Sequence, residues 1–271
     1  MKNTRSNKNK TRIPAIALAT LITGVSLAPA MAADYLRIGL IHERSDNTTF
    51  LDRQCEPAGD TVAYFGCDEG DDGRRIGARG DFGNSDGLEL AWGRDFNATW
   101  RGEVVLAYQG DFEFDGNANF IESGQLQPVS GSISQWRAGL NAYLDLAAAF
   151  GHENLRAAPY VGLGLGVARN RIATMTYTFP ELDGQPALTT VPGTATTGVS
   201  WSAMLGTDIR LNDRNVLDVG LTWSDNGDVR TAAGDIEVIR SGDLLAEVEV
   251  GQTRAELQTW GLRIGLRHYF R

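Results

Sequence analysis

Residues 259–270 read TWGLRIGLRHYF, and this stretch decides the fold. Its alternate positions form two different surfaces. Trp260, Leu262, Ile264 and Leu266 fall on one face, and glycine alternates with Arg263 and Arg267 on the other. Because successive side chains of a β-strand point to opposite sides, we predict a strand with one apolar face and one charged face.

Eight segments with this alternation follow one another along the chain. Their approximate ranges are residues 35–42, 87–94, 99–109, 134–144, 159–169, 197–211, 215–224 and 259–270. The links after even-numbered segments are short or moderate, whereas the links after odd-numbered segments run to roughly twenty to forty polar, Gly-rich residues. This sorting is typical of a closed antiparallel barrel with short periplasmic turns and long external loops. Parts of the long links, such as residues 172–179 and 235–239, could extend the hairpins above the membrane.

The first 32 residues have the features of an export signal. Residues 1–12 contain five basic side chains and no acidic one, residues 13–27 are apolar, and Ala30-Met31-Ala32 has the small-x-small pattern of a cleavage site. We therefore expect residues 1–32 to be a signal peptide that is removed, and residues 33–271 to form one barrel domain. A membrane-anchoring helix is the alternative, but the apolar run is shorter than the ~20 residues that span a bilayer.

Charge and hydropathy narrow the function classes. The whole chain has a net charge of −9, and residues 33–271 alone carry 20 basic and 34 acidic side chains, a net charge of −14. Nucleic-acid binding needs clustered basic charge and is not expected. No apolar run after residue 32 is long enough for a transmembrane helix, so a membrane-embedded form must be a closed barrel.

The six tryptophans fall on the apolar faces near the ends of the predicted strands. They are Trp92, Trp100, Trp136, Trp201, Trp223 and Trp260. Trp92 and Trp100 flank a short link, and the other four lie beside long links. Since indole rings favour the headgroup level of a bilayer, we predict two aromatic girdles. In a soluble core, aromatic side chains would be buried anywhere along the strands.

The opposite faces of the segments should line the barrel interior. Ten charged residues are predicted there: Arg37, Glu89, Arg101, Glu103, Arg137, Asp208, Arg210, Asp218, Arg263 and Arg267. An eight-stranded barrel is only just wide enough for its own side chains, so these groups are expected to form interlocked ion pairs. Gly162, Gly164 and Gly166 would leave space for the long arginines. A narrow ion pathway is the alternative.

Cys55 and Cys67 are separated by twelve positions in a stretch rich in glycine and acidic residues. An exported protein meets an oxidising compartment, so a local disulfide is expected. Metal binding is the rival interpretation. It would need a second cysteine or histidine pair nearby, and the three histidines are scattered along the chain.

The joint pattern resembles the small eight-stranded outer-membrane β-barrels of the OmpA, OmpX and opacity-protein type, which are surface antigens. The resemblance is carried by the export signal, by PYVGLGLG at residues 159–166, and by Leu262, Ile264, Leu266 and Phe270. It implies an all-β, antiparallel, up-and-down transmembrane barrel in the bacterial outer membrane, in contact with lipid and lipopolysaccharide. It also implies that the barrel-assembly machinery recognises Phe270, although His268 and Arg271 depart from the usual terminal pattern.

Three functions fit such a barrel. The first is a structural or surface-interaction role, in which the external loops contact an outside ligand. The second is a narrow pore for small solutes or ions, and the third is a lipid-modifying enzyme. The sequence favours the first. Catalysis is not expected, because no histidine has a serine two residues away in a predicted strand and no hydrolase motif is present. No catalytic residue, cofactor or metal site is predicted.

Overall fold

The computed structural model describes residues 33–55, 61–120, 126–152, 155–182, 185–240 and 243–270. The predicted signal peptide, residues 1–32, lies outside these ranges, as does Arg271. Within them, no helix is long and apolar enough to cross a membrane.

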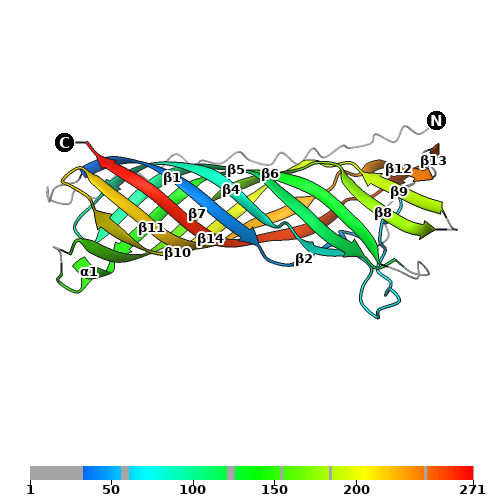
Figure 1. The fold of residues 1–271 in the computed structure, drawn as a ribbon, viewed down its shortest axis with the longest axis horizontal. Helices are drawn as coiled ribbons and strands as arrows, with labels where there is room; N and C mark the ends of the chain where they lie inside the picture. The colour runs from blue at the N-terminus through cyan, green and yellow to red at the C-terminus, as the bar shows by residue number, and fades with distance from the viewer. Residues whose placement is uncertain are drawn as a thin grey trace, which may run out of the picture. The chain divides into compact units, whose positions relative to one another are not determined.

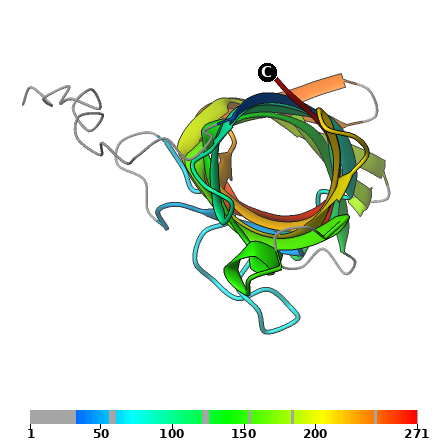
Figure 2. The ribbon, with the colours of Figure 1, turned by 90° about the vertical axis from the view of Figure 1, so that its left-hand side faces the viewer.

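Eight long strands form a closed ring in the described part of the chain (Figures 1 and 2). In ring order they are β1 (Ala33–Ser45), β4 (Asn84–Asp95), β5 (Trp100–Ala118), β6 (Gln127–Asp145), β7 (Ala157–Ile172), β10 (Ala195–Arg210), β11 (Asn215–Arg230) and β14 (Thr253–Tyr269). Every neighbouring pair is antiparallel, and β14 returns to pair with β1 from Ser45↔Thr259 to Tyr35↔Tyr269. The predicted eight-stranded antiparallel barrel is confirmed, and each predicted segment lies on one of these strands.

In β14, the alternating side chains of residues 259–270 point in turn to the outside and to the inside of the barrel. Leu262 and Ile264 are each 50% exposed on the outer wall, whereas Arg263 and Arg267 are each 2% exposed inside. The inner glycines of β7 serve a different purpose from the predicted one. A Cβ on Gly162 would lie 2.6 Å from Cδ1 of Tyr143, so this glycine makes room for a tyrosine ring rather than for an arginine.

The short links lie together at one end of the barrel and are closed by side-chain caps. Asn97 Oδ1 accepts hydrogen bonds from the N–H groups of Thr99 and Trp100, both at 2.8 Å. Asn212 closes the link between β10 and β11 in the same way. The moderate link contains helix α1 (Leu146–Ala149), whose first turn is capped by Asp145. These are the turn roles that favour Asn and Asp.

The other end, which we call the external end, is built from strands rather than from the long loops that the sequence suggested. β5 and β6 each run for 19 residues. The remaining links contain β2 (Thr48–Asp52), β3 (Ala78–Asp81), β8 (Met175–Leu182), β9 (Gln185–Val191), β12 (Gly234–Arg240) and β13 (Asp243–Val250). β2 pairs with β14, β3 with β5 and β8 with β6, so the wall continues beyond the ends of β1, β4 and β7. The hairpin extensions expected at residues 172–179 and 235–239 are confirmed as β8 and β12.

Candidate functional site

The interior of the barrel holds most of the predicted charged residues. Nine of the ten lie inside: Arg37, Glu89, Arg101, Glu103, Arg137, Asp208, Asp218, Arg263 and Arg267. Eight of them are buried, and Arg137 keeps 16% of its side chain exposed. They come from seven of the eight ring strands, so the ring closure is what brings them together.

Arg37 of β1 is the centre of one ion-pair cluster. Its Nε and Nη2 donate to the two carboxylate oxygens of Glu103 at 3.0 and 2.7 Å, and Nη1 donates to Glu89 at 2.5 Å. The hydroxyls of Tyr35 and Tyr143 donate to the same Glu103 carboxylate at 3.1 and 2.8 Å. Two parallel bonds from one guanidinium are the strongest arrangement for such a pair.

A second cluster lies toward the short-turn end and is centred on Asp208 of β10. Arg101 and Arg267 each donate to one of its oxygens at 2.7 Å. Asp218 of β11 lies 3.5 Å from Arg267 and 3.3 Å from Nε of Arg263. Each carboxylate is thus shared by more than one arginine, which ties four strands together across the lumen.

Two tyrosine rings separate the cationic groups of these clusters. The guanidinium of Arg101 lies 4.4 Å from the ring centroid of Tyr143 and 4.6 Å from that of Tyr160. Arg263 donates to both tyrosine hydroxyls, at 3.0 and 2.9 Å. The rings therefore supply cation–π contact and hydrogen-bond acceptors in the same place.

One interior carboxylate was missed by the sequence analysis, and one predicted interior arginine is exposed at the short-turn end. Glu43 of β1 accepts a hydrogen bond from Arg137 at 2.8 Å and another from the hydroxyl of Thr259 at 2.8 Å. It shares the parity of Arg37, but the predicted strand stopped at residue 42. Arg210, the last residue of β10, is exposed, and it lines a pocket at the short-turn end of the barrel together with Asp208 and Arg267.

The corrected interior is electrically balanced. Between the two ends of the described wall, five arginines face five carboxylates: Arg37, Arg101, Arg137, Arg263 and Arg267 with Glu43, Glu89, Glu103, Asp208 and Asp218. At the short-turn end, Asp95 and Arg210 add one charge of each sign beside Arg101 and Arg267. Buried charges are costly unless paired, so balance is what a low-dielectric lumen requires. A cavity of about 60 Å³ remains between the pairs, lined in part by Glu89, Arg137 and Arg263. That volume admits water but no larger solute.

Beyond the ion pairs, toward the external end, the interior becomes apolar. A cluster of buried residues includes Phe50, Phe82, Phe112, Phe114, Ile133 and Leu257. The ring centroids of Phe50 and Phe82 lie 5.2 and 5.1 Å from that of Phe114. Close-packed apolar side chains therefore fill the lumen at the external end, as the ion pairs fill it in the membrane-spanning part.

The tryptophans project from the outer wall. Five of them are about half exposed, and Trp223 is partly buried against Trp201, with ring centroids 4.6 Å apart. Trp223 is directly opposite Trp260 in the β11–β14 register. Between the two groups of tryptophans the wall presents exposed leucine, isoleucine and valine. The role of the tryptophans as interfacial girdles stays a prediction.

Comparison with known proteins gives only distant structural likenesses. No protein-family model and no curated protein matches the chain. Among solved structures, Neisserial surface protein A is 12% identical and has a TM-score of 0.45, with 89% of this chain and 99% of that chain covered. OprG from Pseudomonas aeruginosa is 14% identical, with 88% and 96% covered and a TM-score of 0.49. AlkL, solved in lipid bilayers, is 14% identical, with 92% and 95% covered and a TM-score of 0.40.

The chain forms a closed antiparallel β-barrel of eight long strands within its described residues. The likeness concerns the fold alone. The apolar outer wall and the closed ring are what a bilayer demands of a strand-built protein, and closed barrels of this kind reside in outer membranes.

The cysteine-containing segment of this outer-membrane barrel folds over its external end. Cys55 and Cys67 form the predicted disulfide, with their Cα atoms 5.1 Å apart. Phe65, inside the bridged segment, is buried in the apolar cluster. Asp52 Oδ2 accepts the N–H groups of Phe65 and Gly66 at 2.6 and 2.7 Å. Burial raises the pKa of the Asp52 carboxyl, and these two backbone bonds partly oppose the shift.

A basic pocket opens beside the same segment of the outer-membrane barrel. It has a volume of about 170 Å³ and is lined by residues that include Arg74, Arg75 and Arg79. Asp72 pairs with Arg74 at 2.6 Å, whereas Nε of Arg79 makes only a 3.5 Å bond to the hydroxyl of Thr49. Some of the positive charge of this pocket is therefore not neutralised within the described residues.

The remaining candidates show little catalytic geometry. Nδ1 of His42 lies 2.7 Å from Asp86 and Nδ1 of His268 lies 2.9 Å from Asn215, all at exposed positions. Within the described ranges, no hydroxyl is hydrogen-bonded to a histidine. Phe270 is 53% exposed, and its N–H donates to the Asp34 carbonyl at 2.9 Å. Recognition of Phe270 by assembly machinery stays a prediction.

Proposed function

We propose that this protein is a non-conducting outer-membrane barrel whose external β-structure makes contacts at the cell surface. The observation that carries the proposal is the filled lumen. Balanced ion pairs cross the membrane-spanning part, and an apolar cluster fills the external part. A solute would have to displace both.

The external end supports a surface-contact role. Paired strands, a disulfide and the Asp52 bonds hold this end in one arrangement, so little ordering entropy would be lost when a partner binds. The basic pocket around Arg75 and Arg79 favours an acidic group on that partner. The partner class is therefore an anionic surface polymer or an acidic protein segment.

Planar-bilayer recording tests the closed lumen directly. Purified protein should give no sustained open-channel steps. Steps that persist in protein shown to be folded by heat-modifiable gel migration would favour the narrow-pore alternative, for which the 60 Å³ cavity would be one stage of a path.

Adhesion of whole cells to a sulfated polysaccharide surface tests the external contact. Arg75→Gln/Arg79→Gln should reduce adhesion, whereas Arg210→Gln, at the opposite end of the barrel, should leave it unchanged. Equal adhesion by the wild type, the double variant and the Arg210→Gln control would show that the basic pocket does not contribute to adhesion. The non-enzymatic role is part of the same proposal, and turnover of lipid or peptide by the purified barrel would contradict it.

A further inference from the structure

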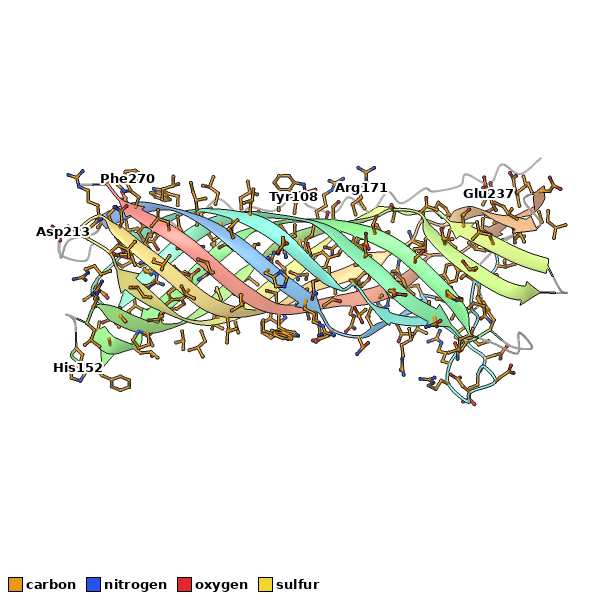
Figure 3. All side chains as sticks on the ribbon, viewed as in Figure 1. Tyr108, His152, Arg171, Asp213, Glu237 and Phe270 are labelled. Carbon is orange, nitrogen blue, oxygen red and sulfur yellow. A yellow bond between two sulfur atoms is a disulfide. The ribbon has the colours of Figure 1, made fainter. Side chains whose placement is uncertain are left out.

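The outer wall of β6, β7 and β10 carries two adjacent arginines just beyond the apolar band. Arg169 and Arg171 of β7 are both exposed. In the strand register Arg169 is opposite Trp136 of β6, and Arg171 is opposite Ser134. Figure 3 shows Arg171 and Tyr108 projecting outward from the same side of the barrel.

A pocket of about 660 Å³ lies at Arg171. It forms where the wall changes composition, because β7 ends at Ile172 and β8 continues the wall by pairing with Val129 and Ser130 of β6. Its lining includes the side chains of Ser132, Ser134, Thr174 and Thr194 and contains no carboxylate among the described residues. A guanidinium surrounded by hydroxyls has the donors that a phosphate group accepts.

The charge on these arginines is not used within the described structure. Neither guanidinium has an ion-pair or hydrogen-bond partner among the residues that the structure describes. The nearest acidic positions on β5 are Asp111, in the bulge between Gln109 and Phe112, and Glu113, opposite Ser132, and neither is among the described residues of the pocket lining. Two adjacent unpaired cations on a protein with a net charge of −9 point to an anionic ligand from outside the chain.

The position of the pocket relative to the apolar band of the wall indicates which anion binds there. The rings of Trp136 and Tyr108 pack against each other at a 45° tilt with their centroids 4.7 Å apart, and Val167 and Val199 begin the apolar wall below them. Indole and phenol rings at the edge of an apolar band lie at the headgroup level of a bilayer. Arg171 is two residues beyond Arg169, about 7 Å farther along the strand, so both arginines lie within the headgroup layer, which extends roughly 5–7 Å beyond the hydrocarbon core on each side.

We propose that Arg169, Arg171 and this pocket bind the phosphate headgroup of a phosphorylated lipid in the membrane around the barrel. The guanidinium groups donate to phosphate oxygens, the serine and threonine hydroxyls add further donors, and Trp136 packs against the region where headgroup and acyl chains meet. The site is on the outer wall, so it does not depend on whether the lumen conducts.

Lipid retention by the full-length barrel tests this assignment. Protein in detergent is mixed with lipid A carrying two phosphates, with dephosphorylated lipid A, or with inorganic phosphate, and bound species are measured by native mass spectrometry. Arg169→Gln/Arg171→Gln should weaken binding of the phosphorylated lipid by about tenfold or more. Arg44→Gln is the matched control, because Arg44 is an exposed arginine opposite Trp260 on the far side of the ring.

Each alternative result has a definite meaning. Equal retention by the wild type and the double variant, both with heat-modifiable migration, would overturn the site. Equal binding of dephosphorylated lipid A would show that apolar contact alone holds the lipid. If inorganic phosphate binds the wild type as well as phosphorylated lipid A does, the pocket is a free-phosphate site and the lipid assignment is wrong.

Discussion

Replacing Arg37 with methionine should destabilise the barrel more than any exposed charge substitution. The change keeps most of the side-chain length but removes the bidentate partner of Glu103 and the 2.5 Å partner of Glu89. Arg37 is fully buried, so no water replaces the lost cation without rearrangement. Breaking a buried pair by removing one partner costs about 3–5 kcal/mol, because an uncompensated charge is left behind.

The measurement is a urea series on protein refolded into lipid vesicles, with the folded fraction read from heat-modifiable gel migration. Arg210→Met is the matched control, since Arg210 is exposed at the end of β10 and should change the free energy of unfolding by no more than about 0.5 kcal/mol. Adding Glu103→Gln to Arg37→Met removes one of the stranded charges and should recover roughly 1–3 kcal/mol. If Arg37→Met costs no more than Arg210→Met, the ion pairs do not hold the lumen closed and the reasoning fails.

Three further predictions concern the wall and the external end. Gly162→Ala should cost about 1–3 kcal/mol in the same urea assay, because its Cβ meets the Tyr143 ring, whereas Gly198→Ala meets nothing within 4 Å and should be neutral. Cys55→Ser/Cys67→Ser should lower the stability of the external segment by on the order of 3 kcal/mol, measured as faster cleavage by protease added from outside. An unchanged cleavage rate would show that the disulfide does not stabilise this segment. The pKa of Asp52 is raised above its ordinary 3.8, so the protonated carboxyl is favoured in the folded state and the stability contribution should fall as the pH rises through this range. Asp52→Asn should remove that decline in a pH series of urea midpoints, and an identical decline in the variant would contradict the assignment.

The strand positions were predictable because alternation is local information. Five predicted segments lie within ring strands and the other three extend past theirs by one residue, and the side chains of β14 face as the period of two requires. The strand ends were not predictable by the same template. β14 begins at Thr253 rather than at residue 259, and β1 continues to Ser45 rather than to residue 42.

The reason lies in the surroundings of the two halves of each long strand. On β14 the outward residues change from Leu262 and Trp260 to Glu256 and Arg254, while the inward ones change from Arg263 to Leu257. The pleat is continuous, but the chemistry of its two faces is exchanged. The sequence prediction required apolar residues on the same face along the whole strand. Each predicted strand therefore stops where the apolar and polar faces change places, and the external strands were predicted as loops.

The ion-pair partners could not be read from the sequence either. Arg37 and Glu89 are separated by 52 residues, and Arg101 and Asp208 by 107. Which inward side chains meet depends on the stagger of the strands around the ring, and single-strand patterns contain no information about that stagger. Nine of the ten charges that parity predicted for the interior lie there, whereas Arg210 is exposed because β10 ends at this residue, and parity alone does not show where a strand ends.

The exchange of faces also explains why the lumen is closed in two chemically different ways. Where the outer wall contacts lipid, the apolar side chains of each strand face outward. The inward side chains are therefore polar and must form ion pairs and hydrogen bonds with one another. Where the wall stands in water, polar side chains face outward and the interior can close by burying phenylalanines, as any soluble sheet does. An aqueous path would need both fillings to be absent at once, and they share no residue whose movement would open both. The same sequence pattern that places the barrel in a membrane therefore argues for a closed barrel, and it leaves the outer wall and the external end as the surfaces on which this protein can act.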